Sequence, residues 1–218
     1  MTKHFKLTAL TFLMVGLMVG GIALYGNFIP GVNAAEKGTV SMMDFEDHAK
    51  VGVMNPKPRG TSDLVRTVDG LSMNIDTTDL PVGAYTAWWI IFNNPGGCTP
   101  SCSMAADTGS KGSPNPADGS ILWATGGIVG PDRVGHFSAS LKVGLENAPG
   151  QVIRGPGLTD PMGADVMLAV RYHGPALWGD AEALLGQIST SSGSCKAFGG
   201  CYDPQAALHR PAGGSMSP

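Results

Sequence analysis

The residues 84–92 constrain the fold of this chain more than any other stretch. Their sequence is AYTAWWIIF, and both of the side-chain sets that alternate along a strand are apolar. Trp88 and Phe92 belong to one set, and Tyr85 and Trp89 belong to the other. A strand that is apolar on both faces is buried on both faces. The sequence therefore predicts a central strand inside a layered β domain.

Further segments show the period-two alternation of strands, and turn residues separate them. They are 64–68, 71–76, 121–129, 134–141, 164–172 and, as an edge strand, 205–209. Asp69-Gly70 favours a tight hairpin between the first two, and we expect residues 130–133 to form a second hairpin between the next two. One short helix is expected at 180–188, with Asp180 as its N-cap. This pattern predicts an all-β fold: a two-layer antiparallel β-sandwich, or a partly closed barrel, with long disulfide-pinned loops.

The first 34 residues have the layout of a secretory signal peptide. Lys3 and Lys6 precede an apolar run, 7–25, and Val32 and Ala34 supply the small residues of a cleavage site. We expect an exported chain that works in the periplasm or outside the cell, with an uncleaved membrane anchor as the alternative. The expected organisation is a signal peptide at 1–34, an irregular entry segment at 35–60, a β-sandwich domain at 61–209 and a disordered tail at 210–218.

All four cysteines follow this segment. An even number of cysteines in an exported chain predicts two disulfides, and four cysteines allow three pairings. We favour Cys98–Cys102 and Cys195–Cys201, because each pair closes a loop rich in Gly, Ser or Pro. The alternative is a metal or redox site, but the spacings match neither zinc pairs nor a thioredoxin motif.

Charge and motifs exclude several functions. The net charge is −3 and the charges are scattered, so the chain has no basic stripe for nucleic acid. There is no GxSxG, HExxH, P-loop or GxGxxG motif. We expect no catalytic residues and no membrane contact beyond the possible anchor.

Histidines are the first candidates for a metal site. His136 and His173 lie on strands that we expect to be neighbours, which lets both imidazoles meet at one edge. His209, Asp165 or Asp203 could then complete a copper or zinc site. The alternative is a set of unrelated histidines, because no recognised ligand spacing is present. A metal ion is the one cofactor that the sequence raises.

Trp88 and Trp89 must face opposite sides of their strand. Either both rings pack inside the domain, or one ring stacks on a sugar or another ligand. With Arg171 and His173, they are the candidate ligand-binding residues.

Loop carboxylates are the candidates for acid–base chemistry. The residues are Asp107, Asp118, Asp160, Asp165 and Asp180. A glycoside hydrolase needs two carboxyl groups at a defined separation. Loop acids in a net-negative exported protein are usually exposed to solvent, and this is the alternative interpretation.

Several short motifs together resemble a family of uncharacterised exported bacterial proteins. They are YTxWWxxFNNP at 85–95, CxxxC at 98–102, GxFSAxL at 135–141, GLxDP at 157–161 and RxHGP at 171–175. The resemblance covers 62–209 and implies export but no activity. The layout also resembles, distantly, the chordin-type extracellular β domain. Trp88-Trp89 stand where that module has a histidine pair, so its metal role does not carry over.

The sequence thus predicts an exported, non-catalytic binding or structural β domain, whose partner is an unknown ligand or a component of the cell envelope. The long loops 93–119, 148–161 and 173–201 are expected to form one binding edge. The first alternative is a periplasmic metal-binding protein that uses His136 and His173. The second is an extracytoplasmic hydrolase that uses loop carboxylates.

Overall fold

A computed structural model describes residues 36–43, 54–98, 102, 108, 115–144 and 152–211. The expected signal peptide at 1–34 lies outside the described residues, as do most of the segment 99–114 and the tail from 212 onward. Within the described parts, no helix is long and apolar enough to cross a membrane.

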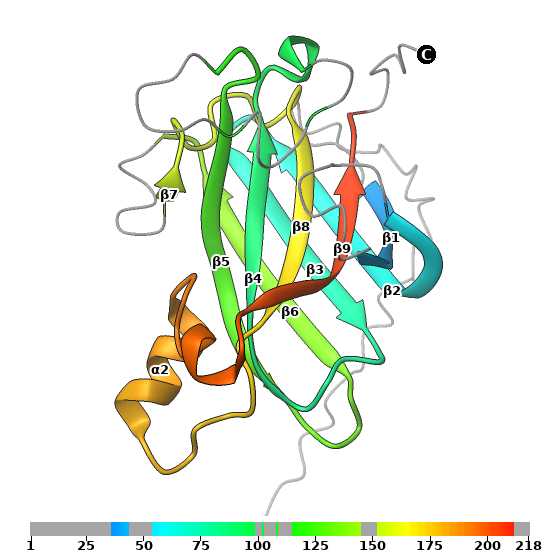
Figure 1. Cartoon of the computed structure of the whole chain (residues 1–218). Helices are drawn as coiled ribbons and strands as arrows, with labels where there is room; N and C mark the ends of the chain where they lie inside the picture. The colour runs from blue at the N-terminus through cyan, green and yellow to red at the C-terminus, as the bar shows by residue number, and fades with distance from the viewer. Residues whose placement is uncertain are drawn as a thin grey trace, which may run out of the picture.

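The described chain consists mostly of β-strands, with one α-helix and two short 3-10 helices (Figure 1). In chain order the elements are β1 (Glu36–Met43), β2 (Met54–Thr67), β3 (Gly70–Thr77), β4 (Gly83–Phe92), η2 (Pro95–Gly97), β5 (Gly119–Val129), β6 (Gly135–Lys142), β7 (Val152–Arg154), β8 (Asp165–Tyr172), α2 (Ala181–Ser189), η4 (Cys195–Phe198) and β9 (Tyr202–His209).

The strands form two antiparallel sheets that pack face to face and do not close into a barrel. The hydrogen-bonded order is β6-β3-β2-β1-β9-β8-β4-β5-β7. The first sheet is β6-β3-β2-β1, and the second is β9-β8-β4-β5 with the short β7 at its edge. β1 and β9 pair through only Ser41–Ala206 and Met42–Gln205. This short pairing is where the two sheets meet in the hydrogen-bonded order. The predicted β-sandwich is confirmed.

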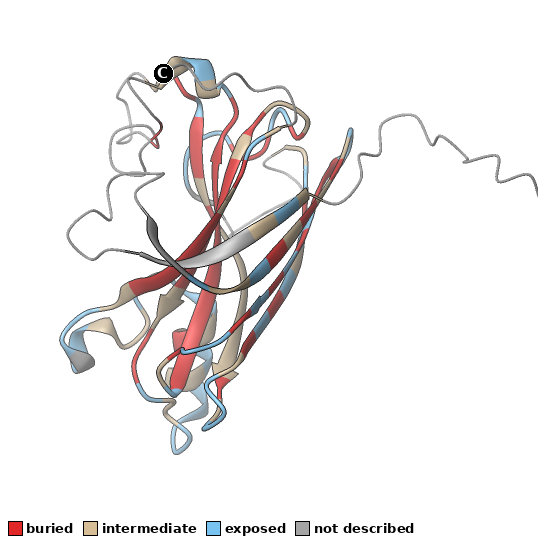
Figure 2. Ribbon diagram, turned by 90° about the vertical axis from the view of Figure 1, so that its right-hand side faces the viewer, coloured by how far each residue is buried: buried red, intermediate tan, exposed pale blue. Residues whose placement is uncertain are grey.

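The two sheets differ in how they bury their faces, as Figure 2 shows. In β3, the apolar side chains Leu71, Met73 and Ile75 are buried and the residues between them are exposed. The outer face of the first sheet therefore meets solvent along this strand. Every residue of β4 is buried, and β4 lies between β5 and β8. The central strand predicted at 84–92 is confirmed.

The buried apolar side chains form two clusters, one on each face of the second sheet. The inner cluster lies between the sheets and includes Trp89 and Leu168. The outer cluster includes Trp88, Phe92 and Cys102. Burial of one large apolar side chain stabilises a fold by roughly 1.5–3 kcal/mol. The second sheet is therefore the buried layer of the domain.

The hairpin expected between residues 121–129 and 134–141 is wrong. β5 pairs with β4, whereas β6 pairs with β3, so the turn at 130–133 carries the chain from one sheet to the other. The reason is the apolar side of β6: Phe137 and Leu141 pack in the inner cluster against the facing sheet. By contrast, the hairpin expected around Asp69-Gly70 forms between β2 and β3.

Two further expectations about strands are wrong. Residues 35–60 are not an irregular segment, because β1 and the start of β2 lie there and pair with each other. Residues 205–209 are not an edge strand, because β9 lies between β1 and β8. The period-two pattern does not tell an edge strand from an inner one when polar side chains such as Gln205 and His209 are buried.

Candidate functional site

The long loops lie at opposite ends of the second sheet. Phe92 pairs with both Gly119 and Asp165, so the segments that follow β4 and precede β8 meet at that end. Tyr85 pairs with Tyr172, so residues 173–201 leave from the other end (Figure 1). The expectation of one shared binding edge is therefore wrong. We call residues 93–118 the η2 loop and residues 173–201 the α2 lobe.

Both local disulfides predicted from the sequence are present. Cys98 is bonded to Cys102 and Cys195 to Cys201, and in each pair the Cα atoms are 4.7 Å apart. The first disulfide lies in the η2 loop and the second in the α2 lobe. Disulfides persist in oxidising compartments, so these two indicate an extracytoplasmic environment.

His173 joins the α2 lobe to the second sheet through a chain of hydrogen bonds. Trp88 Nε1 donates to Thr86 Oγ1 at 2.6 Å, and Thr86 Oγ1 lies 2.7 Å from His173 Nε2. His173 Nδ1 lies 3.0 Å from the carbonyl oxygen of Gly193. A carbonyl oxygen only accepts, so Nδ1 carries the ring proton and Nε2 accepts from the Thr86 hydroxyl. The imidazole is therefore fully bonded in its neutral form.

The surroundings of His173 favour that neutral form. The side chain is 1% exposed, and this burial lowers its pKa. The hydrogen bond to Gly193 raises the pKa, and the charge of Arg171 lowers it further. Burial dominates because an imidazolium ion loses its hydration in the interior. His173 is a structural link in the state that the structure describes.

The same imidazole lies against the Cys195–Cys201 disulfide. His173 Nδ1 is 3.3 Å from Cys201 Sγ and 4.0 Å from Cys195 Sγ. The imidazole nitrogen and the two sulfur atoms lie within 4.8 Å of one another. Among the described residues, no other three His, Cys, Asp or Glu side chains bring their ligand atoms this close together. The sequence spacing did not reveal this group, because 22 residues separate His173 from Cys195.

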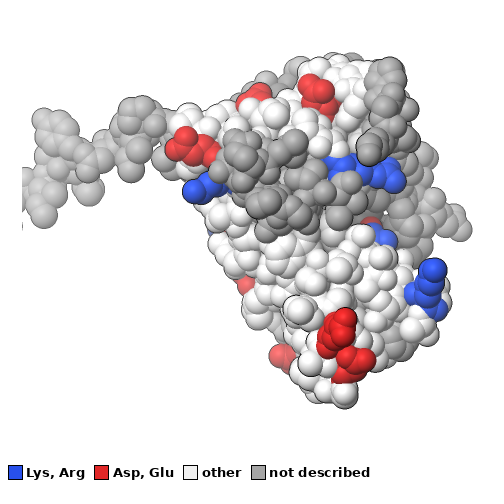
Figure 3. Space-filling view, turned by 90° about the vertical axis from the view of Figure 1, so that its left-hand side faces the viewer, with Lys and Arg blue, Asp and Glu red and all other residues white. Residues whose placement is uncertain are grey.

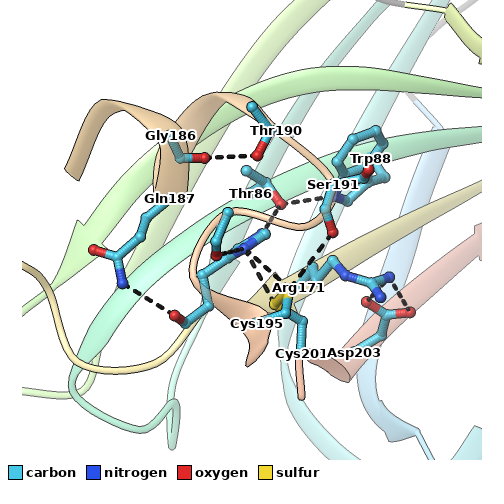
Figure 4. Close-up of a disulfide and its surroundings, with 12 residues drawn as sticks. Thr86, Trp88, Arg171, Gly186, Gln187, Thr190, Ser191, Cys195, Cys201 and Asp203 are labelled. Carbon is cyan, nitrogen blue, oxygen red and sulfur yellow. Dashed lines mark hydrogen bonds and ion pairs between the residues drawn. A yellow bond between two sulfur atoms is a disulfide. The ribbon is translucent and has the colours of Figure 1, made fainter. Parts of the chain in front are cut away.

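Arg171 and Asp203 form an ion pair beside this disulfide (Figure 4). Arg171 Nη1 donates to both carboxylate oxygens of Asp203, at 3.1 and 3.4 Å. The register between β8 and β9 shifts after Val170, and such a bulge re-aims the side chains beyond it. Arg171 therefore has a partner within the fold.

Gln187 holds α2 to the segment that precedes it. Its buried side chain donates from Nε2 to the carbonyl oxygens of His173 and Pro175, at 3.0 and 2.9 Å. Its Oε1 accepts from the amide of Leu177 at 3.0 Å. Gln187 and Thr86 were not singled out from the sequence. Gln187 is the one buried residue of α2, and no motif in the sequence marks it.

α2 forms where the sequence predicts it. Asp180 adopts an extended conformation, and its carboxylate accepts from the amide of Ala183 at 3.0 Å. The helix packs against β4 and β5, where Trp123 Nε1 donates to the carbonyl of Ile188 at 3.2 Å. A Cβ atom at Gly126 of β5 would lie 1.8 Å from that carbonyl oxygen. A glycine is therefore required for this close approach.

The structure buries both tryptophans of the candidate ligand site, as the packing interpretation expects. Trp89 lies in the inner cluster and Trp88 in the outer one. Neither ring is available for stacking on a ligand. Together with the bonded His173 and the paired Arg171, they form a supporting network rather than a binding surface.

The histidines proposed as metal ligands do not come together. His136 is exposed on β6, with Nδ1 2.6 Å from Asp76 Oδ1. His209 is buried, with Nε2 2.7 Å from Ser62 Oγ, and burial lowers its pKa. The strands of His136 and His173 were expected to be neighbours, but β6 and β8 belong to different sheets. The geometry gives no support to a site built from these three residues.

Three of the four described loop acids have a local role. Asp180 caps α2, Asp160 accepts from an amide of the turn that follows it, and Asp165 lies 3.4 Å from Arg210. Burial raises the pKa of Asp165, and Arg210 opposes that shift. Asp118 is exposed with a left-handed backbone, and Asp107 lies outside the described residues.

Most exposed apolar side chains gather at the α2 end of the sandwich. Among the described residues, the large hydrophobic side chains that are exposed are Val68 (59%), Val82 (51%), Trp178 (74%) and Leu185 (60%). Val82 directly precedes β4, and the Tyr172 hydroxyl donates to its carbonyl, so Val82 lies at the same end as the α2 lobe. Val68 lies in the β2–β3 turn at the other end (Figure 1).

This end is also acidic. Among the Lys, Arg, Asp and Glu residues, the α2 lobe contains Asp180, Glu182 and Lys196, all three exposed, so its net charge is −1. In Figure 3, acidic side chains lie at the lower end of the molecule and also at its upper end, with a basic side chain to the right of the lower group. The α2 lobe therefore combines exposed apolar side chains with a small excess of negative charge.

Comparisons with protein families, with curated proteins and with solved structures find no match to this chain.

Proposed function

We propose that the chain is exported and acts outside the cytoplasm as a non-catalytic binding module that recognises a protein of the cell envelope through its α2 lobe. The signal-peptide layout of residues 1–34 and the two disulfides support export. The resemblance to exported bacterial proteins agrees with this location and stays a prediction.

The exposure of Trp178 carries the proposal. Its side chain is 74% exposed on a lobe whose backbone is held by a disulfide, by His173 and by Gln187. Tryptophan is among the residues that contribute most to protein interfaces. A surface that is already ordered loses little conformational entropy on binding. A rigid lobe that presents Trp178 and Leu185 therefore suits a binding surface.

The charge of the lobe indicates the chemistry of the partner. Asp180 and Glu182 follow Trp178 closely in the sequence, whereas the single Lys of the lobe, Lys196, lies in η4. Electrostatic complementarity raises association rates and selects partners. We therefore expect an apolar socket with a basic rim on the partner protein.

Site-specific photocrosslinking tests this proposal. A photoreactive amino acid replaces Trp178 in the full chain, and the matched control replaces Val68, which is exposed at the other end. We expect one crosslinked envelope protein at position 178 and none at position 68. Equal crosslinking at both positions, or none at 178, contradicts the proposal.

Binding of the purified partner completes the test. Trp178→Ala should weaken the affinity at least tenfold, because truncation of a central interface residue typically costs about 2 kcal/mol or more. Glu182→Lys should also weaken the affinity, and this loss should be larger at low salt than at high salt. Val68→Ala should leave the affinity unchanged. Unchanged affinity of Trp178→Ala contradicts the proposal even if crosslinking succeeds.

The other two functions have no comparable support. The histidines expected to bind metal lie apart, and three of the four described loop carboxylates serve local bonds.

A further inference from the structure

We propose that the α2 lobe holds a latent metal site, in which reduction of the Cys195–Cys201 disulfide lets both thiolates and His173 bind one Zn²⁺ or Cu⁺ ion. This inference is independent of the proposed partner binding. It uses a different ligand set from the histidines considered in the sequence.

The atoms already lie close to a metal-site geometry. Typical zinc bonds of about 2.3 Å to sulfur and about 2.0 Å to nitrogen place the ligand atoms roughly 3.5–3.8 Å apart in a tetrahedral site. His173 Nδ1 lies 3.3 Å from Cys201 Sγ and 4.0 Å from Cys195 Sγ. The main movement required is therefore the separation of the two sulfur atoms after their bond breaks. Three protein ligands leave a fourth position for water or a further ligand.

The reduction and the binding step balance separately. A dithiol reductant gives two electrons and two protons to the disulfide, which yields two cysteine thiols and the reductant's own disulfide. The metal ion then displaces the two thiol protons and keeps its oxidation state. Both cysteines are partly exposed, so a reductant and an ion can reach them.

The hydrogen bonds of His173 allow it to become a ligand. In the oxidised protein, Nδ1 carries the proton that Gly193 accepts. As a ligand, Nδ1 needs a free lone pair, so the proton moves to Nε2. Nε2 faces the Thr86 hydroxyl at 2.7 Å, and a hydroxyl both donates and accepts. Thr86 thereby becomes the outer hydrogen-bond partner that orients a metal-bound histidine.

Loss of the hydrogen bond from His173 to Gly193 does not leave the Gly193 carbonyl buried without a partner. Gly193 is only partly buried, so water can satisfy its oxygen once the imidazole turns its lone pair to the metal. Negative charge on two thiolates also has a cation nearby, because Arg171 lies beside the disulfide (Figure 4).

The second disulfide of the chain provides a matched control. Cys98 and Cys102 have the same Cα separation of 4.7 Å, and Cys102 lies in the apolar outer cluster. The described residues place no third ligand of the histidine, cysteine or carboxylate type with this pair. Reduction of Cys98–Cys102 therefore gives two thiols without a histidine partner.

Cobalt titration of the oxidised and the reduced mature chain tests the proposal. The reductant is a phosphine, the probe is Co²⁺ alone, and circular dichroism confirms the fold of each sample. We expect one Co²⁺ per reduced chain, with thiolate-to-cobalt charge-transfer absorption, tetrahedral bands and displacement by Zn²⁺. The oxidised chain should show none of these bands. Absence of thiolate–cobalt absorption in the folded, reduced chain overturns the proposal.

Variants assign the ligands. Cys98→Ser with Cys102→Ser should keep the site, and Cys195→Ser with Cys201→Ser should abolish it. His173→Gln should lower Co²⁺ affinity at least tenfold and change the band pattern, because a nitrogen ligand is lost. Alkylation of the reduced wild-type thiols gives the same loss without a sequence change, if the second cysteine variant does not fold. A site that survives in Cys195→Ser with Cys201→Ser contradicts the proposal.

Discussion

The described residues of the η2 loop and the α2 lobe contact the same face of the second sheet, and the two regions are held to it in opposite ways. Each contains one local disulfide with a Cα separation of 4.7 Å. The disulfide of the η2 loop belongs to the apolar outer cluster with Phe92. The α2 lobe is held by directed hydrogen bonds from His173 and Gln187.

This difference predicts which of the two regions is more sensitive to single substitutions. Apolar burial has no preferred direction and depends on the area removed from water. A buried hydrogen-bond chain requires every donor and acceptor, and the loss of one member leaves its partners unsatisfied. We therefore expect single polar substitutions, pH and redox state to affect the α2 lobe more than the η2 loop.

Gln187→Leu is expected to have the largest effect. It leaves three backbone groups without partners: the carbonyls of His173 and Pro175 and the amide of Leu177. An unsatisfied buried group costs about 1–3 kcal/mol; this applies in full to the His173 carbonyl and in part to the other two groups, whose bonds are part-buried, so the free energy of unfolding should fall by about 3 kcal/mol. Urea denaturation measures it. Leu185→Gln, exposed on the same helix, is the control, and similar losses in both variants would break the comparison.

Gly126→Ala tests the docking of α2 on β5. The added Cβ would lie 1.8 Å from the carbonyl oxygen of Ile188, which is backbone and must move. We expect a loss of about 1–3 kcal/mol, typical of overpacking, and faster hydrogen exchange in α2. At Gly127 the nearest atom to an added Cβ, on Phe137, is 3.6 Å away, so Gly127→Ala is the control. Equal effects at both positions contradict the close approach.

Acid should destabilise the fold through its buried histidines. Burial lowers the pKa of His173 and of His209 below the ordinary value of 6.5. At a pH between the lowered and the ordinary pKa, the unfolded chain binds more protons than the folded chain. The free energy of unfolding therefore falls as the pH falls below 6.5, and it is fully restored above 6.5. The slope reaches about 1.4 kcal/mol per pH unit for each histidine.

Substitution separates the two contributions. His173→Gln should reduce the slope of unfolding free energy against pH, and His209→Gln should reduce it independently. His136→Gln is the control, because that side chain is exposed on β6. An unchanged slope in His173→Gln would contradict the buried neutral state of this residue.

Trp178→Ala should have the smallest effect on stability. The side chain is 74% exposed, and substitutions at such positions usually change the free energy of unfolding by less than about 0.5 kcal/mol. Thermal and urea denaturation check this. A loss of more than about 1 kcal/mol would show that Trp178 packs on the domain rather than facing solvent.

The parts of the fold that the sequence predicts are those set by local chemistry. The apolar residues 84–92 require two covered faces, Asp180 caps a helix, and short loops favour the local cysteine pairs. The partner of each strand depends on distant residues, so β5 and β6 looked like a hairpin although they belong to different sheets. β9 looked like an edge strand because its buried polar side chains resemble exposed ones in sequence.

The site was predicted less well than the fold. The role of His173 depends on the register that places Thr86 opposite Arg171, and on the turn that brings Gly193 back to the ring. Neither contact has a signature at short spacing. Exposure of Trp178 depends equally on tertiary structure, because the residue type alone does not fix whether a tryptophan is buried.

The central claim is that a chain of hydrogen bonds holds the α2 lobe to the second sheet. The protonation state of the His173 ring in the oxidised protein tests this claim most directly. Imidazole ¹⁵N chemical shifts, measured by NMR at neutral pH, distinguish the two neutral tautomers and the charged ring. The account predicts a neutral ring with the proton on Nδ1, which donates to Gly193, and with Nε2 accepting from Thr86. A charged ring, or a proton on Nε2, would contradict it.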